Sequence, residues 1–390
     1  MKNLVIHDLD GQGWEKIKAD YEGWNVFADN GRIHPCMGCF GCWAKTPGEC
    51  VIKDGYDLVG QIFKDAEEIV VISRWTFGGF SPFVKNIFDR SIGHALPFFQ
   101  IINGEMHHVP RYEDEKIDLY IRFYGEEPSE EEKEVSREYV RAVCRNTLMT
   151  LKEVSWNKTV QPSEGDCFPV KETAGHAEKP LSGTVFLNAS TRGNASNSKA
   201  YLEKLAGIMG VSPEILNIND YQGKTDVLAD LILSAEKLVI AMPLYLDGIP
   251  AQVIPLLEKL YEKDAAGGKK VYVIANMGFY ESIQIRNMLA LMKVWCRHLR
   301  YVFGGGLAVG AGGTLKKMME ASGAEGPAKK AVEGLEKLAE AVKEGSIIPD
   351  IYADPYNLSI EEYTEICHSA WYKWAEATGL SKEDLFRKMP

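Results

Sequence analysis

The sequence contains no long apolar run. In 390 residues, no stretch approaches the roughly 20 consecutive apolar residues that a membrane-spanning helix requires. The first residues, MKNLVIHDLDGQG, do not have the pattern of a signal peptide, because their apolar run is short and charged residues follow at once. We therefore expect no membrane partner and a cytoplasmic location.

Basic clusters are also lacking. The formal net charge is −11, and no block or helix face is basic. This argues against nucleic acid as a partner. The chain has no Gly-x-Gly-x-x-Gly fingerprint, no Walker loop, no Gly-x-Ser-x-Gly elbow and no His-Glu-x-x-His motif. The common motifs for tight dinucleotide binding, P-loop nucleotide chemistry and hydrolysis are thus absent.

What the sequence does contain is an alternation of short β-branched runs and amphipathic stretches with helical spacing. Predicted strands lie at residues 4–9, 25–31, 67–73, 117–125, 183–190, 214–219, 237–243, 269–276 and 301–310. A helix over residues 136–152 closes the first half. The pattern predicts an α/β protein with two tandem, doubly wound parallel sheets.

Composition suggests the boundaries. We expect one domain over residues 1–152, a polar linker over residues 153–180, a second domain over residues 181–345 and a helical C-terminal extension over residues 346–390. Residues 65–86 align without a gap to residues 234–255, and both segments read as strand, glycine-containing loop and helix. This faint repeat indicates an internal duplication.

The segment FLNASTRGNASNSKAYLEKL places small hydroxyl and amide residues between a strand and a helix. Such a loop directs N–H groups, hydroxyls and the helix dipole to one point, which favours a phosphate. An N-cap cluster without a ligand is the alternative. The candidate phosphate ligands are Ser190, Thr191, Arg192, Asn194, Ser196, Asn197 and Ser198.

Two later strand ends carry distinctive loops, MPLYLDG and NMGFYE. Each has an aromatic residue that could flank an isoalloxazine ring and a glycine where backbone can approach it. Ligands of doubly wound sheets lie at the carboxyl ends of the strands. A flavin mononucleotide therefore fits better than a bound dinucleotide. The candidate residues are Pro243, Leu244, Tyr245, Leu246, Asp247, Gly248, Asn276, Met277, Gly278 and Phe279.

These three loops resemble those of the NADPH-dependent FMN reductase family, within the flavodoxin-like superfamily. Ser190, Arg192, Ser196, Asn197 and Ser198 match its first loop. The Pro-x-Tyr of its second loop is matched as well, whereas its leading glycine is replaced by alanine. The resemblance implies a flavodoxin-like fold, FMN bound non-covalently by residues 183–345, and NAD(P)H as a transient substrate. No side chain need act as a catalytic acid or base, because the flavin performs the chemistry.

A second motif gives Cys36-x2-Cys39-x2-Cys42-x7-Cys50. Four thiolates at this spacing suit a [4Fe–4S] cluster. Zinc could use the same four, and free thiols or an intramolecular disulfide are further alternatives. The segment resembles the compact motif of the iron–sulfur flavoproteins, also flavodoxin-like, which carry it after the second strand. All three readings stay open at this point.

The two predicted domains lack different parts. The first has only DGQGWEKIKADY after its first strand, and Arg74 and Thr76 stand where the second has Pro243 and Tyr245. We expect it to bind no FMN. The second domain has no cysteine after its second strand. The resemblance suggests an internal pseudo-dimer, in which the cysteine motif faces the flavin, and allows a homo-oligomer.

The function expected from the sequence is therefore an FMN-dependent oxidoreductase. It would pass electrons from NAD(P)H or a reduced carrier to an acceptor, a flavin, a quinone or a protein, with a [4Fe–4S] cluster at the cysteine motif as a second centre. A non-enzymatic, flavodoxin-like electron carrier is one alternative. A thiol or metal sensor on a degenerate flavodoxin fold is the other.

Overall fold

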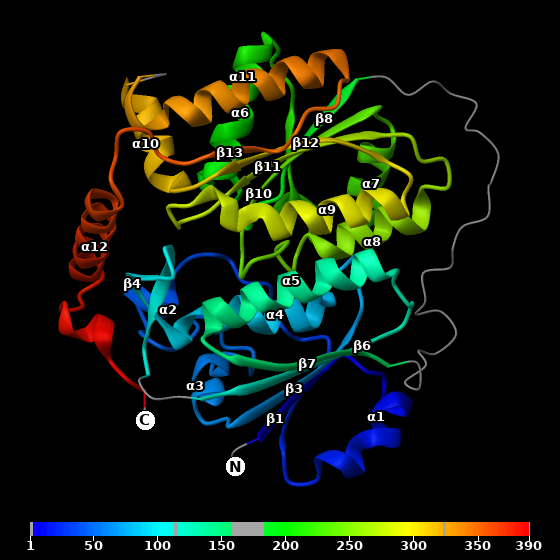
Figure 1. Ribbon diagram of the computed structural model, residues 1–390, viewed down its shortest axis with the longest axis vertical. Coiled ribbons are helices and arrows are strands. Elements are labelled where there is room, and N and C mark those ends of the chain that lie inside the picture. The colour runs from blue at the N-terminus through cyan, green and yellow to red at the C-terminus, as the bar shows by residue number, and fades with distance from the viewer. Residues whose placement is uncertain (1–2, 113–115, 158–182, 323–324, 390) are drawn as a thin grey trace. The chain divides into compact units, whose positions relative to one another are not determined.

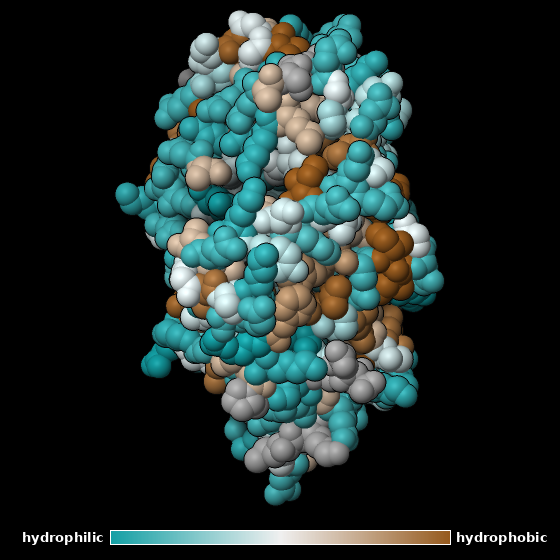
Figure 2. All heavy atoms as spheres, turned by 90° about the vertical axis from the view of Figure 1, so that its left-hand side faces the viewer, coloured by the Kyte–Doolittle hydropathy of each residue, from teal (hydrophilic) through white to brown (hydrophobic). Residues whose placement is uncertain are grey.

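A computed structural model of the chain describes residues 3–112, 116–157, 183–322 and 325–389. It divides into two compact units: unit 1 comprises residues 1–169 and 364–390, and unit 2 comprises residues 170–363. Among the described residues, no helix is long and apolar enough to cross a membrane. On the face drawn in Figure 2, hydrophilic side chains predominate and hydrophobic ones form small separate groups.

Unit 2 contains a parallel sheet of six strands in the order β13-β12-β11-β10-β8-β9. The strands are β8 (Thr184–Asn188), β9 (Ile215–Asn217), β10 (Lys237–Pro243), β11 (Lys270–Asn276), β12 (Val302–Val309) and β13 (Ile351–Ala353). Residues 238–242 of β10 are at most 1% exposed, because helices cover both faces of the sheet. The first five strands are those that the sequence predicts.

The helices of unit 2 follow its strands in alternation. They are α6 (Asn197–Met209), α7 (Thr225–Leu233), α8 (Ile254–Lys263), α9 (Arg286–His298), α10 (Gly312–Ser322) and α11 (Lys329–Glu344), with single turns η3 (Gly193–Ala195), η4 (Ile218–Tyr221), η5 (Ser282–Ile285) and η6 (Gly326–Ala328). In Figure 1, α6 and α11 lie side by side on one face of the sheet, and α8 and α9 cover the other. Gly210 ends α6 in the left-handed conformation, as the sequence predicts.

Unit 1 contains a parallel sheet of five strands in the order β2-β1-β3-β6-β7. A separate antiparallel hairpin, β4-β5, is inserted before β6. The strands are β1 (Asn3–His7), β2 (Asn25–Ala28), β3 (Glu68–Arg74), β4 (Ala95–Ile102), β5 (Glu105–Pro110), β6 (Asp118–Tyr124) and β7 (Thr150–Trp156). Both sheets therefore have the flavodoxin-like order 2-1-3-4-5, to which unit 2 adds β13 at the edge.

The helices of unit 1 are shorter. They are α1 (Gly11–Ile17), α2 (Gly41–Ala44), α3 (Val59–Lys64), α4 (Pro82–Arg90), α5 (Glu130–Thr147) and most of α12 (Ile360–Ala377), with turns η1 (Lys18–Tyr21), η2 (Ser91–His94) and η7 (Glu383–Phe386). Figure 1 shows α4 and α5 on one side of the sheet and α1 on the other.

Two predicted segments are wrong at the end of unit 1. The helix predicted over residues 136–152 ends at Thr147, because Leu148 adopts a left-handed conformation with φ 58°. Residues 150–156, expected as helix end and linker, form the edge strand β7. Its sequence, TLKEVSW, is rich in polar residues and none of its residues is buried, so the segment resembles a connection rather than a core strand. Residues 158–180 of the predicted linker lie outside the described residues.

The predicted C-terminal helical extension is also corrected. Residues 351–353 form β13, which pairs with β12 in the sheet of unit 2, and residues 364–390 group with unit 1. β13 has three residues next to Asp354 and Pro355, too few to show strand alternation. Trp371 and Tyr372 pack against a core cluster of unit 1 that includes Phe98 and Leu385.

The predicted repeat is matched in detail by the turn after the third strand of each sheet. In unit 1, Thr76 and Gly79 form an isolated bridge; in unit 2, Tyr245 and Gly248 do. The two residues inside each turn have positive φ: 49° and 91° in unit 1, and 36° and 62° in unit 2. Each residue of the turn in unit 1 lies 169 positions before its counterpart in unit 2. This is the offset of the alignment between residues 65–86 and 234–255, which therefore needs no gap across the turn.

Candidate functional site

The three candidate flavin loops follow β8, β10 and β11, which are neighbours in the sheet of unit 2. The register aligns their carboxyl ends: Ala241 pairs with Asn188, and Pro243 pairs with Asn276. Hydrogen bonds tie each loop to the next strand, from the Leu244 amide to the Asn276 carbonyl at 2.8 Å and from the Ala189 amide to the Ala241 carbonyl at 2.8 Å. The loops therefore converge at one edge of the sheet.

Asn188, the last residue of β8, organises the first loop. Its Nδ2 donates to the Gly193 carbonyl at 2.9 Å and to the Asn217 Oδ1 at 2.9 Å. Its Oδ1 accepts from the Ser190 amide at 3.3 Å and from the Ser196 hydroxyl at 3.2 Å. The side chain is fully buried, so this network fixes the loop that leads into α6.

The start of α6 has the chemistry of an anion site. Ser196 caps the helix by accepting from the Lys199 amide at 3.1 Å, and the first turn holds no acidic residue. The amides of Asn197 and Ser198 lie where a helix offers no acceptor, and no described group accepts from them. Arg192 is exposed and forms no ion pair within the described ranges. These donors and the helix dipole favour a phosphate.

The second loop forms a tight turn beside the first. The hydroxyls of Tyr245 and Thr191 are 3.0 Å apart and share a hydrogen bond. Leu246 and Asp247 occupy the two positive-φ positions of the turn, and Asp247 is 3% exposed. The phenol of Tyr245 is therefore held over the first loop.

The third loop is anchored from both sides. Asn276 Nδ2 donates to the Ser198 hydroxyl at 2.9 Å, which links β11 to the first turn of α6. The Met277 amide donates to the Val309 carbonyl at 3.2 Å, and the Phe279 carbonyl accepts from the Ala311 amide at 2.6 Å. Gly278 is exposed at the tip, with open space around the position of a Cβ.

The structure thus places all seventeen candidate flavin residues on these three loops, at the last positions of β10 and β11, or on the first turn of α6. Those that are buried by at least nine-tenths are Ser190, Ser196, Ser198, Asp247, Gly248, Asn276 and Met277. Asn194 and Arg192 are exposed. That these residues bind FMN stays a prediction.

Two parts of this edge could not be predicted from the sequence motifs. One is Asn188, which the sequence indicates only as part of a strand. The other is the glycine run after β12: a Cβ at Gly310 would lie 2.1 Å from the Tyr280 carbonyl oxygen, and one at Gly312 would lie 2.9 Å from the Asn276 Cβ. A second glycine cluster at the end of a strand was the available signal.

The same edge of unit 1 carries different groups. After β1, the half-buried Asp8 carboxylate accepts from the Arg74 amide at 3.1 Å, and desolvation raises the pKa of this carboxyl group. Asp10 caps α1 by accepting from the Gly13 amide at 2.6 Å. Two carboxyl groups therefore occupy the turn that in unit 2 carries hydroxyls and open amides. This environment disfavours a phosphate.

The cysteine motif lies in unit 1 between β2 and α3. Cys39 precedes the short helix α2 and Cys42 lies in it. Phe40, the residue directly before the helix, has a left-handed conformation with φ 54°. Burial and the nearby Asp89 carboxylate raise the pKa of the Cys36 thiol to about 12. Burial also raises the pKa of Cys42 well above its usual value, with further contributions from the other three thiols. The four sulfur atoms are therefore electrostatic neighbours.

The arrangement of these thiols bears on what they could hold. None of the four forms a disulfide, and Cys167 lies outside the described residues. Within the described ranges, no three His, Cys, Asp or Glu side chains come close enough to hold one metal ion. A [4Fe–4S] cluster makes a different demand, because its four thiolates bind four separate irons. Four neighbouring thiols fit such a cluster by their chemistry.

Helix α4 holds both ends of the cysteine segment. Asn86 Oδ1 accepts from the Cys36 amide at 3.1 Å, and Asn86 Nδ2 donates to the His34 carbonyl at 3.1 Å. Arg90, whose side chain is fully buried, pairs with Asp54 and donates to the Ile52 carbonyl at 3.0 Å. Arg90 also contacts the Cys50 thiol. Two residues of one helix thus fix the backbone on either side of the motif.

The strand order, the paired loops and the repeated turn define a class: a tandem pair of flavodoxin-like α/β domains. No protein-family model matches the chain. Similarity to curated proteins covers part of it. The chain is 32% identical over 88 residues to an iron–sulfur flavoprotein of Methanocaldococcus jannaschii, which is 23% of this chain and 42% of that protein. An iron–sulfur flavoprotein of Methanosarcina thermophila is 30% identical over 91 residues, covering 21% of this chain and 47% of that protein.

The chain therefore spans less than half the length of these curated relatives. Among solved structures, an azoreductase from Bacillus anthracis aligns with 57% of this chain and 98% of its own, at 12% identity and a TM-score of 0.24. A score that low carries no weight for the fold, which rests on the strand order. Both curated relatives are iron–sulfur flavoproteins, the family that the cysteine motif of the sequence resembles.

Proposed function

We propose that the chain is an FMN-dependent oxidoreductase that takes electrons from NAD(P)H or a reduced carrier and passes them to a small-molecule or protein acceptor. The observation that carries the proposal is the convergence of three loops on unit 2 around the amides of Asn197 and Ser198. Partial similarity to flavoproteins supports it.

In this proposal the residues of unit 2 bind FMN and orient its ring. The amides at the start of α6, with the hydroxyls of Ser190 and Thr191, would hold the phosphate, and Arg192 would add charge. The turns at residues 244–248 and 276–279 would flank the ring. The flavin supplies the hydride or electron chemistry when bound, so no acid or base among these side chains is required.

A steady-state assay tests the proposal. Protein loaded with FMN should oxidise NADH or NADPH rapidly when free FMN or a quinone is added. Reversible one-electron reduction without turnover would instead support a flavodoxin-like carrier. A colourless protein that gains no flavin from added FMN would contradict both and leave the thiol or metal sensor.

We further propose that Cys36, Cys39, Cys42 and Cys50 hold a [4Fe–4S] cluster. The four thiols are close to one another, and Asn86 and Arg90 of α4 hold the backbone on both sides of the motif; we call these two residues the clamp. Both observations support a defined site for four thiolates. Iron and sulfide analysis of anaerobically purified protein should give about four of each per chain. Zinc in place of iron, or no metal at all, would contradict it.

The expected pairing of the two units also remains a proposal. Electrons would pass between the flavin of unit 2 and the cysteine motif of unit 1 within one chain, in the cytoplasm, where thiols stay reduced. Slow flavin reoxidation in a Cys39→Ser variant, with unchanged FMN affinity, would support this relay. Sedimentation would report any homo-oligomer.

A further inference from the structure

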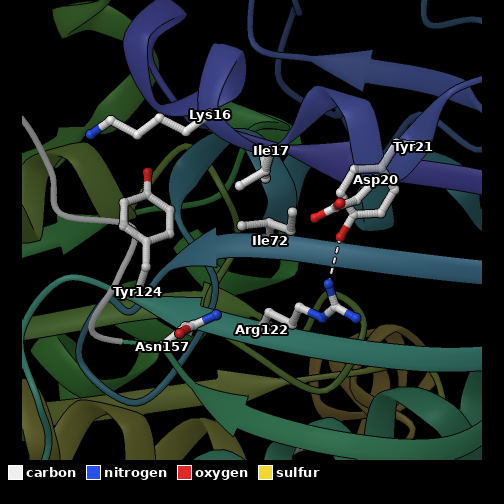
Figure 3. A pocket seen from close by; sticks show the side chains of 8 residues that line it. All are labelled: Lys16, Ile17, Asp20, Tyr21, Ile72, Arg122, Tyr124 and Asn157. Carbon is white, nitrogen blue, oxygen red and sulfur yellow. Dashed lines mark hydrogen bonds between the residues drawn. The ribbon is translucent and has the colours of Figure 1, made fainter.

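Unit 1 contains a cavity of about 340 Å³ on the sheet face that α1 covers only in part. Its lining comes from α1 and η1 on one side and from β3, β6 and the end of β7 on the other, as Figure 3 shows. The lining residues are Lys16, Ile17, Asp20, Tyr21, Ile72, Arg122, Tyr124 and Asn157. The volume falls within the usual range of small-molecule sites, roughly 300–1,000 Å³.

Comparison with unit 2 shows why this face is open. Arg122 pairs with Ile72 in the register of unit 1, and Ile274 pairs with Ala241 in that of unit 2. Ile72 and Ala241 are 169 positions apart, so Arg122 stands where unit 2 has Ile274. Ile274 is fully buried on the face that α6 and α11 cover. In unit 1, the helix after the first strand, α1, has 7 residues, whereas its counterpart α6 in unit 2 has 13.

A packing defect in a hydrophobic core would be lined by apolar side chains, but the guanidinium of Arg122 lines this cavity. Arg122 Nη1 donates to the Tyr21 hydroxyl at 2.6 Å. Within the described part of the chain it forms no other hydrogen bond, and no carboxylate forms an ion pair with it. A guanidinium has five N–H donors, so most of them face the cavity or solvent.

The other side chains that line the cavity place apolar and aromatic surfaces beside the Arg122 guanidinium. Ile17 and Ile72 meet in the middle of the cavity in Figure 3, and the rings of Tyr21 and Tyr124 stand on either side of them. Lys16, in the last turn of α1, adds a second cation that is exposed and forms no ion pair in the described ranges. Asp20 places one carboxylate on the rim. The net charge of the lining is positive by one.

We propose that this cavity is a second ligand site, separate from the flavin loops, for a small organic carboxylate with a flat apolar body. The planar fork of Arg122 matches a carboxylate, which can accept two parallel hydrogen bonds from it. The two isoleucines and two tyrosine rings take the apolar body. Lys16 adds attraction from the rim, which Asp20 offsets in part.

Binding of 2-naphthoate to the full chain, measured by calorimetry at low salt, tests the proposal. We expect saturable binding at one site per chain. The neutral isostere 2-naphthamide should bind at least about tenfold more weakly, because it cannot form a charge-assisted pair. Equal affinity for the two compounds, no saturable binding, or equally tight binding of inorganic phosphate would each overturn it.

Three variants locate the site. Arg122→Gln should weaken naphthoate binding about tenfold or more, since it removes the charged donor. Lys16→Gln, on an exposed helix face, should weaken it up to about fivefold, and Asp20→Asn should strengthen it by a similar factor. These two rim variants keep the test decisive if the Arg122 variant fails to fold. Affinity that stays constant in both rim variants would overturn the assignment.

Competition separates this site from the flavin site. Saturating FMN should leave the naphthoate affinity of the wild-type chain unchanged, because the lining residues all belong to unit 1. Displacement of naphthoate by FMN would place the probe on the flavin loops and overturn the proposal. The outcome does not depend on whether the flavin proposal holds.

Discussion

The carboxyl edges of the two sheets differ most in the turn after the first strand. In unit 2, Asn188 arranges hydroxyls and amides around the start of a 13-residue helix. In unit 1, the matching position is His7, followed by Asp8 and Asp10 and a 7-residue helix. Yet the turns after the third strands have the same backbone form. Turns of the same backbone form thus accompany hydroxyls and open amides in unit 2 and acidic groups in unit 1.

The helix after the third strand differs in the opposite sense, because here unit 1 has the specialised residues and unit 2 lacks them. Asn86 and Arg90 of α4 clamp the cysteine segment, whereas the matching positions of α8 are Pro255 and Lys259. Lys259 is on the surface and pairs with Glu262 at 2.6 Å. The residues that hold the cysteine segment in unit 1 thus have no counterpart in unit 2, which has no cysteine at the matching place.

The largest expected effect comes from removing the clamp. Arg90→Ala should destabilise unit 1 by about 3–5 kcal/mol, because it leaves the Asp54 carboxylate without its partner and removes the donor to the Ile52 and His34 carbonyls. The matched Lys259→Ala should change stability by less than about 1 kcal/mol, as for a surface pair. Urea unfolding of both variants measures this. Similar losses in the two variants would remove the contrast between α4 and α8.

The second effect is a pH dependence specific to unit 1. His7 is 2% exposed and stacks on Trp14 at 4.2 Å, and burial lowers its pKa from 6.5 to about 4. The unfolded chain therefore binds the proton first, so stability is full above about pH 6.5 and falls as the pH drops toward 4. At pH 4.5 the loss should be about 2–3 kcal/mol.

His7→Asn, which copies the residue of unit 2, should remove this part of the acid sensitivity. Urea unfolding at pH 7.5 and 4.5 compares the two proteins. An identical fall in stability for the wild type and the variant would show that His7 does not titrate in this range.

The third effect concerns the proposed anion site of unit 2. Asn197→Asp keeps the shape of the side chain and favours the helix, because an acidic group suits its first turn. A carboxylate beside the phosphate should still weaken FMN binding by about 100-fold. Asn194→Asp, whose side chain meets Lys199 Nζ at 2.8 Å, should weaken it much less. Fluorescence titration measures both; equal losses would count against a phosphate at the start of α6.

The smallest effect is at the shared turn. Tyr245→Phe removes the hydroxyl bonded to Thr191 and should weaken FMN binding about fivefold. Thr76→Val, the matching change in unit 1, should leave FMN affinity unchanged. An equal loss in Thr76→Val would mean that unit 1 also contributes to flavin binding.

Much of this architecture could be predicted from the sequence. Strands β8, β10, β11 and β12 of unit 2 are apolar runs whose residues are mostly buried, and such runs stand out without tertiary information. The edge strand β7 and the three-residue β13 could not be recognised, because exposure makes one polar and brevity hides the other. The hairpin β4-β5 and helix α10 were also missed. The role of Asn188 depends on contacts across the loop, which no spacing rule shows.

The central claim is that one unit holds the flavin and the other does not. Hydrogen–deuterium exchange of the full chain, with and without FMN, tests it most directly. The account predicts slower exchange in peptides covering residues 189–198, 244–248 and 276–281, and no change in those covering residues 8–13 and 74–79. Protection of the latter two by FMN, or of none of the five, would contradict it.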